Sequence, residues 1–302
     1  MQPSQTKSIE SSAQELERLY NARSFDSLAG LFTPDMQRLL ERQRFFPTLM
    51  EQAGRITTRA LISAEKNLVV YRTGFEEGVF SMRISVDGGG RIDGLLLTPF
   101  IDESLPAMSR NSTPMQLPFH GEWTVFWGGE TRGQNHHVDV PAQKHAFDLV
   151  ITDAGGRTYR NNGEVNEDYY AFGQNILAPC DAMVAAVSDS VPDNRPGVMN
   201  PKRVPGNYVL LRTAAREYIL LAHLKQSSIR VKEGENVKQG TLIGICGNSG
   251  NSSEPHLHFH IQNGDNLHTS TGVKCYFDKI VVNGIQKSDY SPVKGDKVHN
   301  LP

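Results

Sequence analysis

The chain has 302 residues, of which 38% are hydrophobic and 21% charged, so it is long enough for two domains and is not disordered by composition. Its formal net charge is −2, and Lys and Arg are spread along the sequence, which excludes a basic nucleic-acid surface and a polybasic membrane segment. No apolar run approaches the ~20 residues of a transmembrane span, so peptide, carbohydrate and small-molecule partners remain open.

Two features bear on the compartment. The N-terminal stretch MQPSQTKSIESSAQ is polar and has no apolar signal-peptide core, so either the protein is cytosolic or Met1 replaces a leader. The three cysteines have no CxxC spacing, which argues against a zinc site built from cysteines. They allow at most one internal disulfide, and the sequence does not show whether Cys180, Cys246 and Cys275 pair.

The first part of the chain has a helical pattern from about Ser8 to Gly54. Ser24 and Thr33 are expected N-caps, and Gly54 is an expected stop. The apolar residues that recur at helical spacing are Leu16, Leu19, Tyr20, Leu28, Leu31, Phe32, Met36, Leu39 and Leu40. Four strand-like segments follow, ALISAEK, LVVYRTGF, GVFSMRISV and RIDGLLLTPF, with DGGGR as a hairpin turn.

This order of elements predicts a small α+β domain over residues 1–101. It resembles the cone-shaped, cystatin-like domains of the nuclear transport factor 2 kind, in which a curved sheet wraps a long helix. The domain has no histidine and no carboxylate–histidine arrangement typical of catalysis, so a binding or targeting role is expected.

Residues 102–118 contain three prolines and no periodicity, which predicts an exposed linker between halves that fold separately. Residues 119–302 are predicted to form a strand-rich, all-β domain with long loops and no helix. Its strand-like segments are TVFWGG, AFDLVI, AMVAAVS, NYVLLRT, EYILLAHL, TLIGICG and HLHFHIQ.

The ten histidines are unevenly distributed, with none before His120. In a strand, HLHFH places its three histidines on one face and Leu257 and Phe259 on the other, so that one imidazole can bind a metal while the next reaches a bound water. A solvated strand face explains an isolated HxH equally well. The histidines that fall in three short stretches are His136, His137, His145, His223, His256, His258 and His260.

Asp148 lies in the apolar segment AFDLVI, where a carboxylate is costly unless it is paired or bound to a metal. Lys144 on the same strand would be ~13 Å away, which favours a metal. His223, in the apolar segment LLAHLKQ, is either a core histidine or part of the same site. Two histidines and one aspartate with an open fourth position are typical of catalytic zinc, and two remaining histidines suit a general base and an oxyanion stabiliser.

Four separated motifs, AFDLV, GNYVLL, EYILLAHL and VKEGENVKQGTLIGICGNSGNSSEPHLHFHIQ, resemble the lysostaphin-type zinc metallopeptidases over residues 120–285. The resemblance implies a groove-bearing antiparallel β-sandwich with one zinc ion per chain on the floor of the groove. It implies Asp148 and His258 as zinc ligands, and His223 and His256 as catalytic residues.

The first zinc ligand departs from the pattern of many members, because Lys144 stands four residues before Asp148. The segment GGETRGQNHHVDVPAQKHAFD resembles a branch with an upstream N-x-H triplet, which implies His137 as the ligand. His136 and His145 are the alternatives. Strand alternation turns His145 away from the face of Asp148 unless a bulge reverses it, but it does not rank His136 against His137.

The resemblance implies a zinc-dependent metalloendopeptidase that hydrolyses stem or cross-bridge peptides of bacterial peptidoglycan, with zinc-bound water as nucleophile. It also implies a periplasmic or secreted mature protein whose leader is absent from this sequence. The alternative is an inactive relative that binds the cell wall or activates a hydrolase. VKEGENVKQGTLIG also resembles biotinyl and lipoyl carriers, but the turn CGNSGNSSEP lacks their modifiable lysine.

Overall fold

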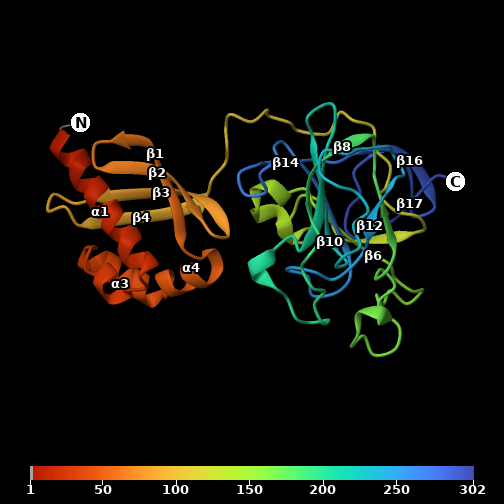
Figure 1. Ribbon diagram of the computed structural model, residues 1–302, viewed down its shortest axis with the longest axis horizontal. Helices are drawn as coiled ribbons and strands as arrows, with labels where there is room; N and C mark the ends of the chain where they lie inside the picture. Colours follow the sequence, from red (N-terminus) through yellow and green to blue (C-terminus); the bar gives the residue numbers. More distant parts are fainter. Residues whose placement is uncertain (1–2) are drawn as a thin grey trace. The chain divides into compact units, whose positions relative to one another are not determined.

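The computed structural model describes residues 3–302, with side chains from residue 9 onward, and its contacts divide the chain into two units at residues 1–100 and 101–302 (Figure 1). Among the described residues, no helix is long and apolar enough to cross a bilayer. The expectation that Met1 replaces a leader concerns a residue outside the described range.

The first unit combines four helices with a four-stranded antiparallel sheet in which the strands follow in sequence order. The helices are α1 (Pro3–Asn21), α2 (Phe25–Ala29), α3 (Pro34–Arg42) and α4 (Phe45–Ala53), and the strands are β1 (Ile56–Glu65), β2 (Leu68–Phe75), β3 (Gly78–Val86) and β4 (Ile92–Pro99). One apolar core joins residues of the helices to residues of the sheet.

The local signals of the first unit lie where they were predicted. Ser24 and Thr33 occupy the N-cap positions of α2 and α3, although neither side chain makes a capping hydrogen bond. Gly54 follows α4 with a φ of 75°, a conformation that favours glycine. The DGGGR turn is closed by the Asp87 amide, which donates to the Arg91 carbonyl at 2.8 Å. Helices followed by four antiparallel strands are therefore confirmed, although α1 already begins at Pro3 and the left-handed Arg44, with a φ of 49°, divides the last predicted helix into α3 and α4. The cone shape stays a prediction.

The second unit is built from antiparallel strands and short 3₁₀ turns, and no α-helix occurs among its residues. Its large sheet has the order β11-β8-β9-β10-β13-β6-β5-β17-β15-β16, with β14 paired to β13, while β7 and β12 form a separate pair. The strands are β5 (Trp123–Trp127), β6 (Phe147–Val150), β7 (Asn175–Leu177), β8 (Ala182–Ser188), β9 (Asn207–Arg212), β10 (Tyr218–Leu224), β11 (Asn236–Val237), β12 (Leu242–Ile245), β13 (Leu257–Gln262), β14 (Gly272–Val273), β15 (Phe277–Val282), β16 (Ile285–Tyr290) and β17 (Lys297–Asn300).

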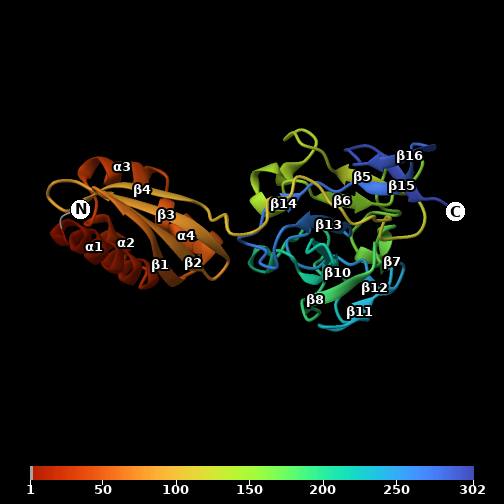
Figure 2. The same cartoon turned by 90° about the horizontal axis from the view of Figure 1, so that it is seen from above.

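The strands that carry the predicted site residues are neighbours in this sheet. Figure 2 shows β13 between β10 and β6, the order that their hydrogen bonds give. In the register of these strands, His258 lies opposite Asp148 on β6 and opposite Ala222 on β10. The predicted all-antiparallel, β-rich second unit is thus present, and its description as a groove-bearing sandwich stays a prediction.

Residues 102–118 belong to the second unit, and the predicted linker is exposed over most of residues 103–110 but packs into that unit near its end. Met115 and Leu117 are almost completely buried in its main core. Thr113 donates its amide hydrogen to the buried Glu217 carboxylate at 3.2 Å. Proline content and missing periodicity predict an irregular backbone, but they do not predict burial. Met115 and Leu117 are buried by residues that are distant from them in the sequence. The three cysteines are buried and free.

Candidate metal centre

Asp148 and His258 form the centre of the site as a cross-strand pair. Phe147, Leu149 and Phe259 belong to the main apolar core, so alternation turns Asp148 and His258 toward the opposite face of the sheet. His258 Nδ1 lies 2.8 Å from Asp148 Oδ1, and both side chains are buried. The predicted alternation within HLHFH therefore holds on β13, whereas His256 precedes the strand.

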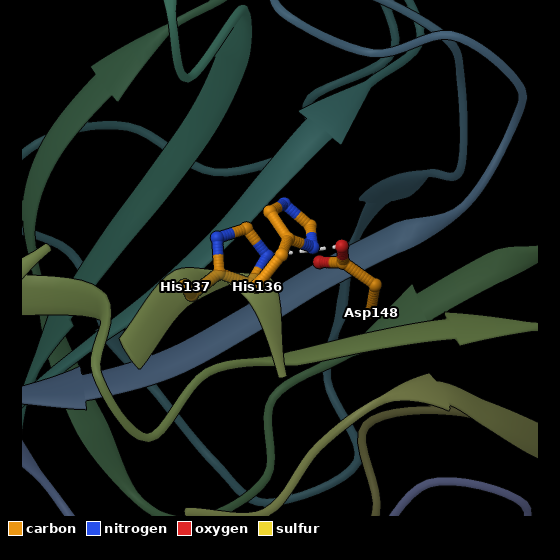
Figure 3. A group of neighbouring side chains, drawn as sticks. All are labelled: His136, His137 and Asp148. Atoms are coloured by element: carbon orange, nitrogen blue, oxygen red, sulfur yellow. Dashed lines mark hydrogen bonds and ion pairs between the residues drawn. The ribbon is translucent and has the colours of Figure 1, made fainter. Parts of the chain in front are cut away.

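His137 reaches the same carboxylate from a loop. It lies in the 3₁₀ turn η1 (His136–Asp139), and its Nε2 is 3.0 Å from Asp148 Oδ2 (Figure 3). The fully buried Asn135 holds this loop, because its Oδ1 accepts from the His137 amide at 3.0 Å and its Nδ2 donates to the Ala146 carbonyl at 3.2 Å. The asparagine of the N-x-H triplet thus ties η1 to the start of β6.

His136 is the nearest competitor of His137. Ligand atoms of His136, His137 and Asp148 all lie within 4.8 Å of one another, so these three alone can form a cation site (Figure 3). His136 is exposed, however, and its ring packs on His137 at 3.8 Å between centroids and edge-on to Trp127 at 5.1 Å. His258, by contrast, is buried and its Nδ1 lies 2.8 Å from the same carboxylate.

His145 lies away from this cluster. It falls in the turn between the 3₁₀ turn η2 (Pro141–Gln143) and β6, and the charged groups that act on its pKa are Lys144, Glu130 and Lys274. Lys144 lies in the same turn rather than on a strand, so the strand distance expected between it and Asp148 does not apply. The alternation argument does not apply to His145, because β6 begins at Phe147 and His145 stands in a turn before it.

His223 is presented by an irregular end of β10. The pairing of β10 with β9 shifts between Leu221 and Leu224, and His223 has a φ of 61°, a left-handed conformation that is uncommon for residues other than glycine. Its Nδ1 donates to the Ser249 carbonyl at 2.8 Å. A Cβ at Gly206 would lie 2.4 Å from that same oxygen, so a glycine is needed where the two loops meet.

His256 is anchored in the same way. Its Nδ1 donates to the Glu254 carbonyl at 2.8 Å and lies 3.2 Å from Ser252 Oγ. A carbonyl oxygen only accepts hydrogen bonds, so the ring proton sits on Nδ1 in both His223 and His256. Each ring therefore keeps Nε2 free, and His256 Nε2 lies 3.7 Å from Asp148 Oδ1.

The structure brings all five predicted site residues into one cluster. The His223 ring lies 4.7 Å from the His256 ring and 5.7 Å from the His258 ring, and the His137 and His258 rings are 4.8 Å apart. Three imidazoles surround Asp148, and no lysine or arginine pairs with it in the described part of the chain. Two imidazole nitrogens and a carboxylate oxygen suit zinc, so the residues fit that metal.

The electrostatics of the cluster follow from burial. Burial by itself raises the pKa of Asp148, but the charges of His137 and His256 beside it and the hydrogen bond from His137 hold that pKa well below its usual range. Burial lowers the pKa of His258 to about 4 and holds the pKa of His223 well below its ordinary value. These two imidazoles are therefore neutral at pH 7, the form that binds metal or accepts a proton.

Comparisons with known proteins match residues 168–269 to Peptidase family M23. This stretch contains His223, His256 and His258, and it leaves His137 and Asp148 outside. The chain is 45% identical over 58 residues to an uncharacterized metalloprotease of Haemophilus influenzae, which covers 18% of this chain and 12% of that protein. It is 33% identical over 87 residues to the peptidoglycan DD-endopeptidase ShyC of Vibrio cholerae, covering 29% of this chain and 19% of that protein.

The chain thus spans less than a fifth of the length of these relatives. Among solved structures, the catalytic domain of the antimicrobial peptidase lysostaphin from Staphylococcus simulans is 24% identical, with a TM-score of 0.26. That alignment covers 38% of this chain and 81% of the lysostaphin domain. The sequence comparisons support a peptidase domain at residues 168–269.

Proposed function

We propose that this protein is a zinc-dependent metalloendopeptidase that hydrolyses peptide bonds in bacterial peptidoglycan, with zinc held by His137, Asp148 and His258. The observation that carries the proposal is the buried Asp148 carboxylate, which has an imidazole nitrogen within 3.0 Å of each oxygen. The match to Peptidase family M23 supports the reaction class, and the matched peptidoglycan endopeptidase supports the substrate class.

Zinc bound there would polarise the scissile carbonyl and lower the pKa of a water molecule that it holds. The protein's own contribution is to place two imidazoles beside that position. Because His223 and His256 each donate Nδ1–H to a backbone carbonyl, each ring is fixed in one tautomer with Nε2 toward the cluster. One ring can then take the proton of the attacking water, and the other can stabilise the developing oxyanion.

His136 has a packing role in this proposal. It lies edge-on to Trp127 and against His137, and so it limits the orientations of the ligand ring on its exposed side. The substrates are stem or cross-bridge peptides. Because peptidoglycan lies outside the cytoplasm, the mature protein is periplasmic or secreted. The first unit has a binding or targeting role.

The test is digestion of purified peptidoglycan by the zinc-loaded full chain, with mass spectrometry of the released fragments. We expect peptide-linked fragments to appear, to vanish on chelation and to return when zinc is added back. The matched control is His145→Ala, which changes a histidine outside the cluster and should cleave normally. Binding to peptidoglycan without fragments would instead support the inactive, wall-binding or hydrolase-activating alternative.

A further inference from the structure

Behind His258, away from Asp148, a chain of buried hydrogen bonds runs along β13. His258 Nε2 lies 2.9 Å from His260 Nδ1, and His260 Nε2 lies 2.9 Å from Gln262 Oε1. The Gln262 amide nitrogen donates to the Gly264 carbonyl at 2.8 Å. His260 and Gln262 are almost completely buried, so water does not replace these partners.

The Gly264 carbonyl, at the end of this series of hydrogen bonds, determines which atom donates in each of them. The Gly264 carbonyl can only accept, so the Gln262 nitrogen must face it and Oε1 must face His260. Oε1 can also only accept, and therefore His260 carries its proton on Nε2. His260 Nδ1 then has a lone pair, and it accepts from a proton on His258 Nε2.

This proton position leaves His258 Nδ1, the nitrogen that faces Asp148, without a proton. A neutral His258 with its proton on Nε2 has a lone pair on Nδ1, 2.8 Å from Asp148 Oδ1. Two buried lone pairs at that distance repel unless a cation lies with them. Without the hydrogen bonds to His260 and Gln262, His258 is free to carry its proton on Nδ1 and to donate it to Asp148. That hydrogen bond would take up the nitrogen and the oxygen that are proposed to bind the metal.

We propose that His260 and Gln262 are positioning residues that keep the proton of His258 on Nε2 and so keep Nδ1 available for the metal. The inference rests on the proposed function, because it takes His258 Nδ1 as a zinc-binding atom. Neither residue touches the metal. Their effect is to exclude the competing hydrogen bond between His258 and Asp148.

The test measures zinc affinity of the full chain by competition with a chelator. Gln262→Met and His260→Leu each replace a hydrogen-bonding side chain by an apolar one of similar size. Each should weaken zinc binding by about 10–100-fold, as is usual for residues behind a metal ligand. His260→Gln offers an acceptor to His258 and a donor to Gln262, so it should restore most of the affinity. Phe259→Leu, on the opposite face of the same strand, is the matched control and should leave zinc affinity unchanged.

Ring-nitrogen NMR of histidine-labelled protein gives a second readout that does not need zinc. We expect the proton on Nε2 of His258 and of His260 in the wild type, and a mixture of tautomers at His260 in Gln262→Met. A neutral His258 protonated on Nδ1 alone, or unchanged zinc affinity in both link-breaking variants, would overturn the inference. A wild-type chain that shows the Nε2 protons but binds no zinc would overturn the proposed function and leave the hydrogen-bond chain standing.

Discussion

In the first unit the core is apolar apart from its tyrosines and Thr73, whose Oγ1 has no hydrogen-bond partner. At the edge of this core the Arg59 side chain, only 8% exposed, pairs with Glu10 and Glu17. In the second unit, buried amide, hydroxyl, imidazole and carboxylate side chains occur from the segment before β5 onward. They include Asn111, Asn135, Asp148, Asn207, Glu217, His223, Ser249, His258, His260 and Gln262. These side chains form hydrogen bonds with one another or with the backbone.

Buried polar groups are stable only with partners, so the two units depend on different forces. The first unit is held by apolar packing that many side chains share. The second depends in addition on hydrogen bonds that have one correct arrangement, and the same bonds orient the candidate ligands. A change at one polar residue should therefore alter the site in the second unit, whereas a polar change in the first should affect stability alone.

The largest effect is expected from His137→Ala. Removing this ligand should take away most of the bound zinc and with it all hydrolysis, because only Asp148 and His258 then remain to hold the metal. His136→Ala and His145→Ala should keep the metal. Elemental analysis of the purified variants measures this directly. Loss of zinc in His136→Ala with retention in His137→Ala would assign the ligand to His136.

Replacement of His223 or His256 by Ala should reduce hydrolysis by roughly 10²–10⁴-fold while zinc content stays near normal. The reason is that both rings are held by backbone carbonyls and not by Asp148. Fragment release and zinc content are measured on the same preparations. A His256→Ala protein that lost its metal would show that the roles of His256 and His258 are reversed.

Removal of residues 101–118 should destabilise the second unit, although their composition alone predicts that a fragment beginning near Pro118 folds. The deletion takes Met115 and Leu117 out of the core and leaves Glu217 buried without Ser112 and Thr113. We expect a loss of roughly 3 kcal/mol or more. Urea unfolding of residues 119–302 against residues 101–302 measures it, and equal midpoints would restore the linker interpretation.

Acid should weaken the second unit before the first. The folded-state pKa of His258 is about 4 and that of His260 about 3, below the ordinary value of 6.5, so the unfolded chain binds more protons as pH falls from 6.5 toward 4. Stability of the metal-free second unit should therefore drop across this range. The first unit has no histidine, and its Glu10, whose pKa the Arg59 hydrogen bond lowers, costs stability only as pH falls below the ordinary value of 4.5, so this unit should respond later. Calorimetry of chelated protein at several pH values should resolve two transitions that separate on acidification.

The smallest effect is expected from Thr73→Val in the first unit. Valine has nearly the shape of threonine, and the buried hydroxyl that it replaces has no partner, so the change should stabilise by about 1 kcal/mol. Zinc content should not change. Thermal unfolding measures the shift, and destabilisation would mean that the hydroxyl is hydrogen-bonded after all.

The sequence by itself predicted what depends on near neighbours in the chain. Helix caps at Ser24 and Thr33, the stop at Gly54 and the four strands of the first unit follow from periodicity and turn chemistry, which act over a few residues. The alternation that separates His258 and His260 from Leu257 and Phe259 is equally local. Asp148 was found because a carboxylate in an apolar strand demands a partner.

Tertiary structure alone decided which groups meet. The burial of Met115 and Leu117, the loop that carries His137 to Asp148 and the left-handed turn at His223 all depend on contacts with residues distant in sequence. The proton position on His258 depends on the Gly264 carbonyl through two intervening side chains. Such arrangements produce no periodic pattern in the sequence, because each depends on individual donors and acceptors that come together only after the strands have paired.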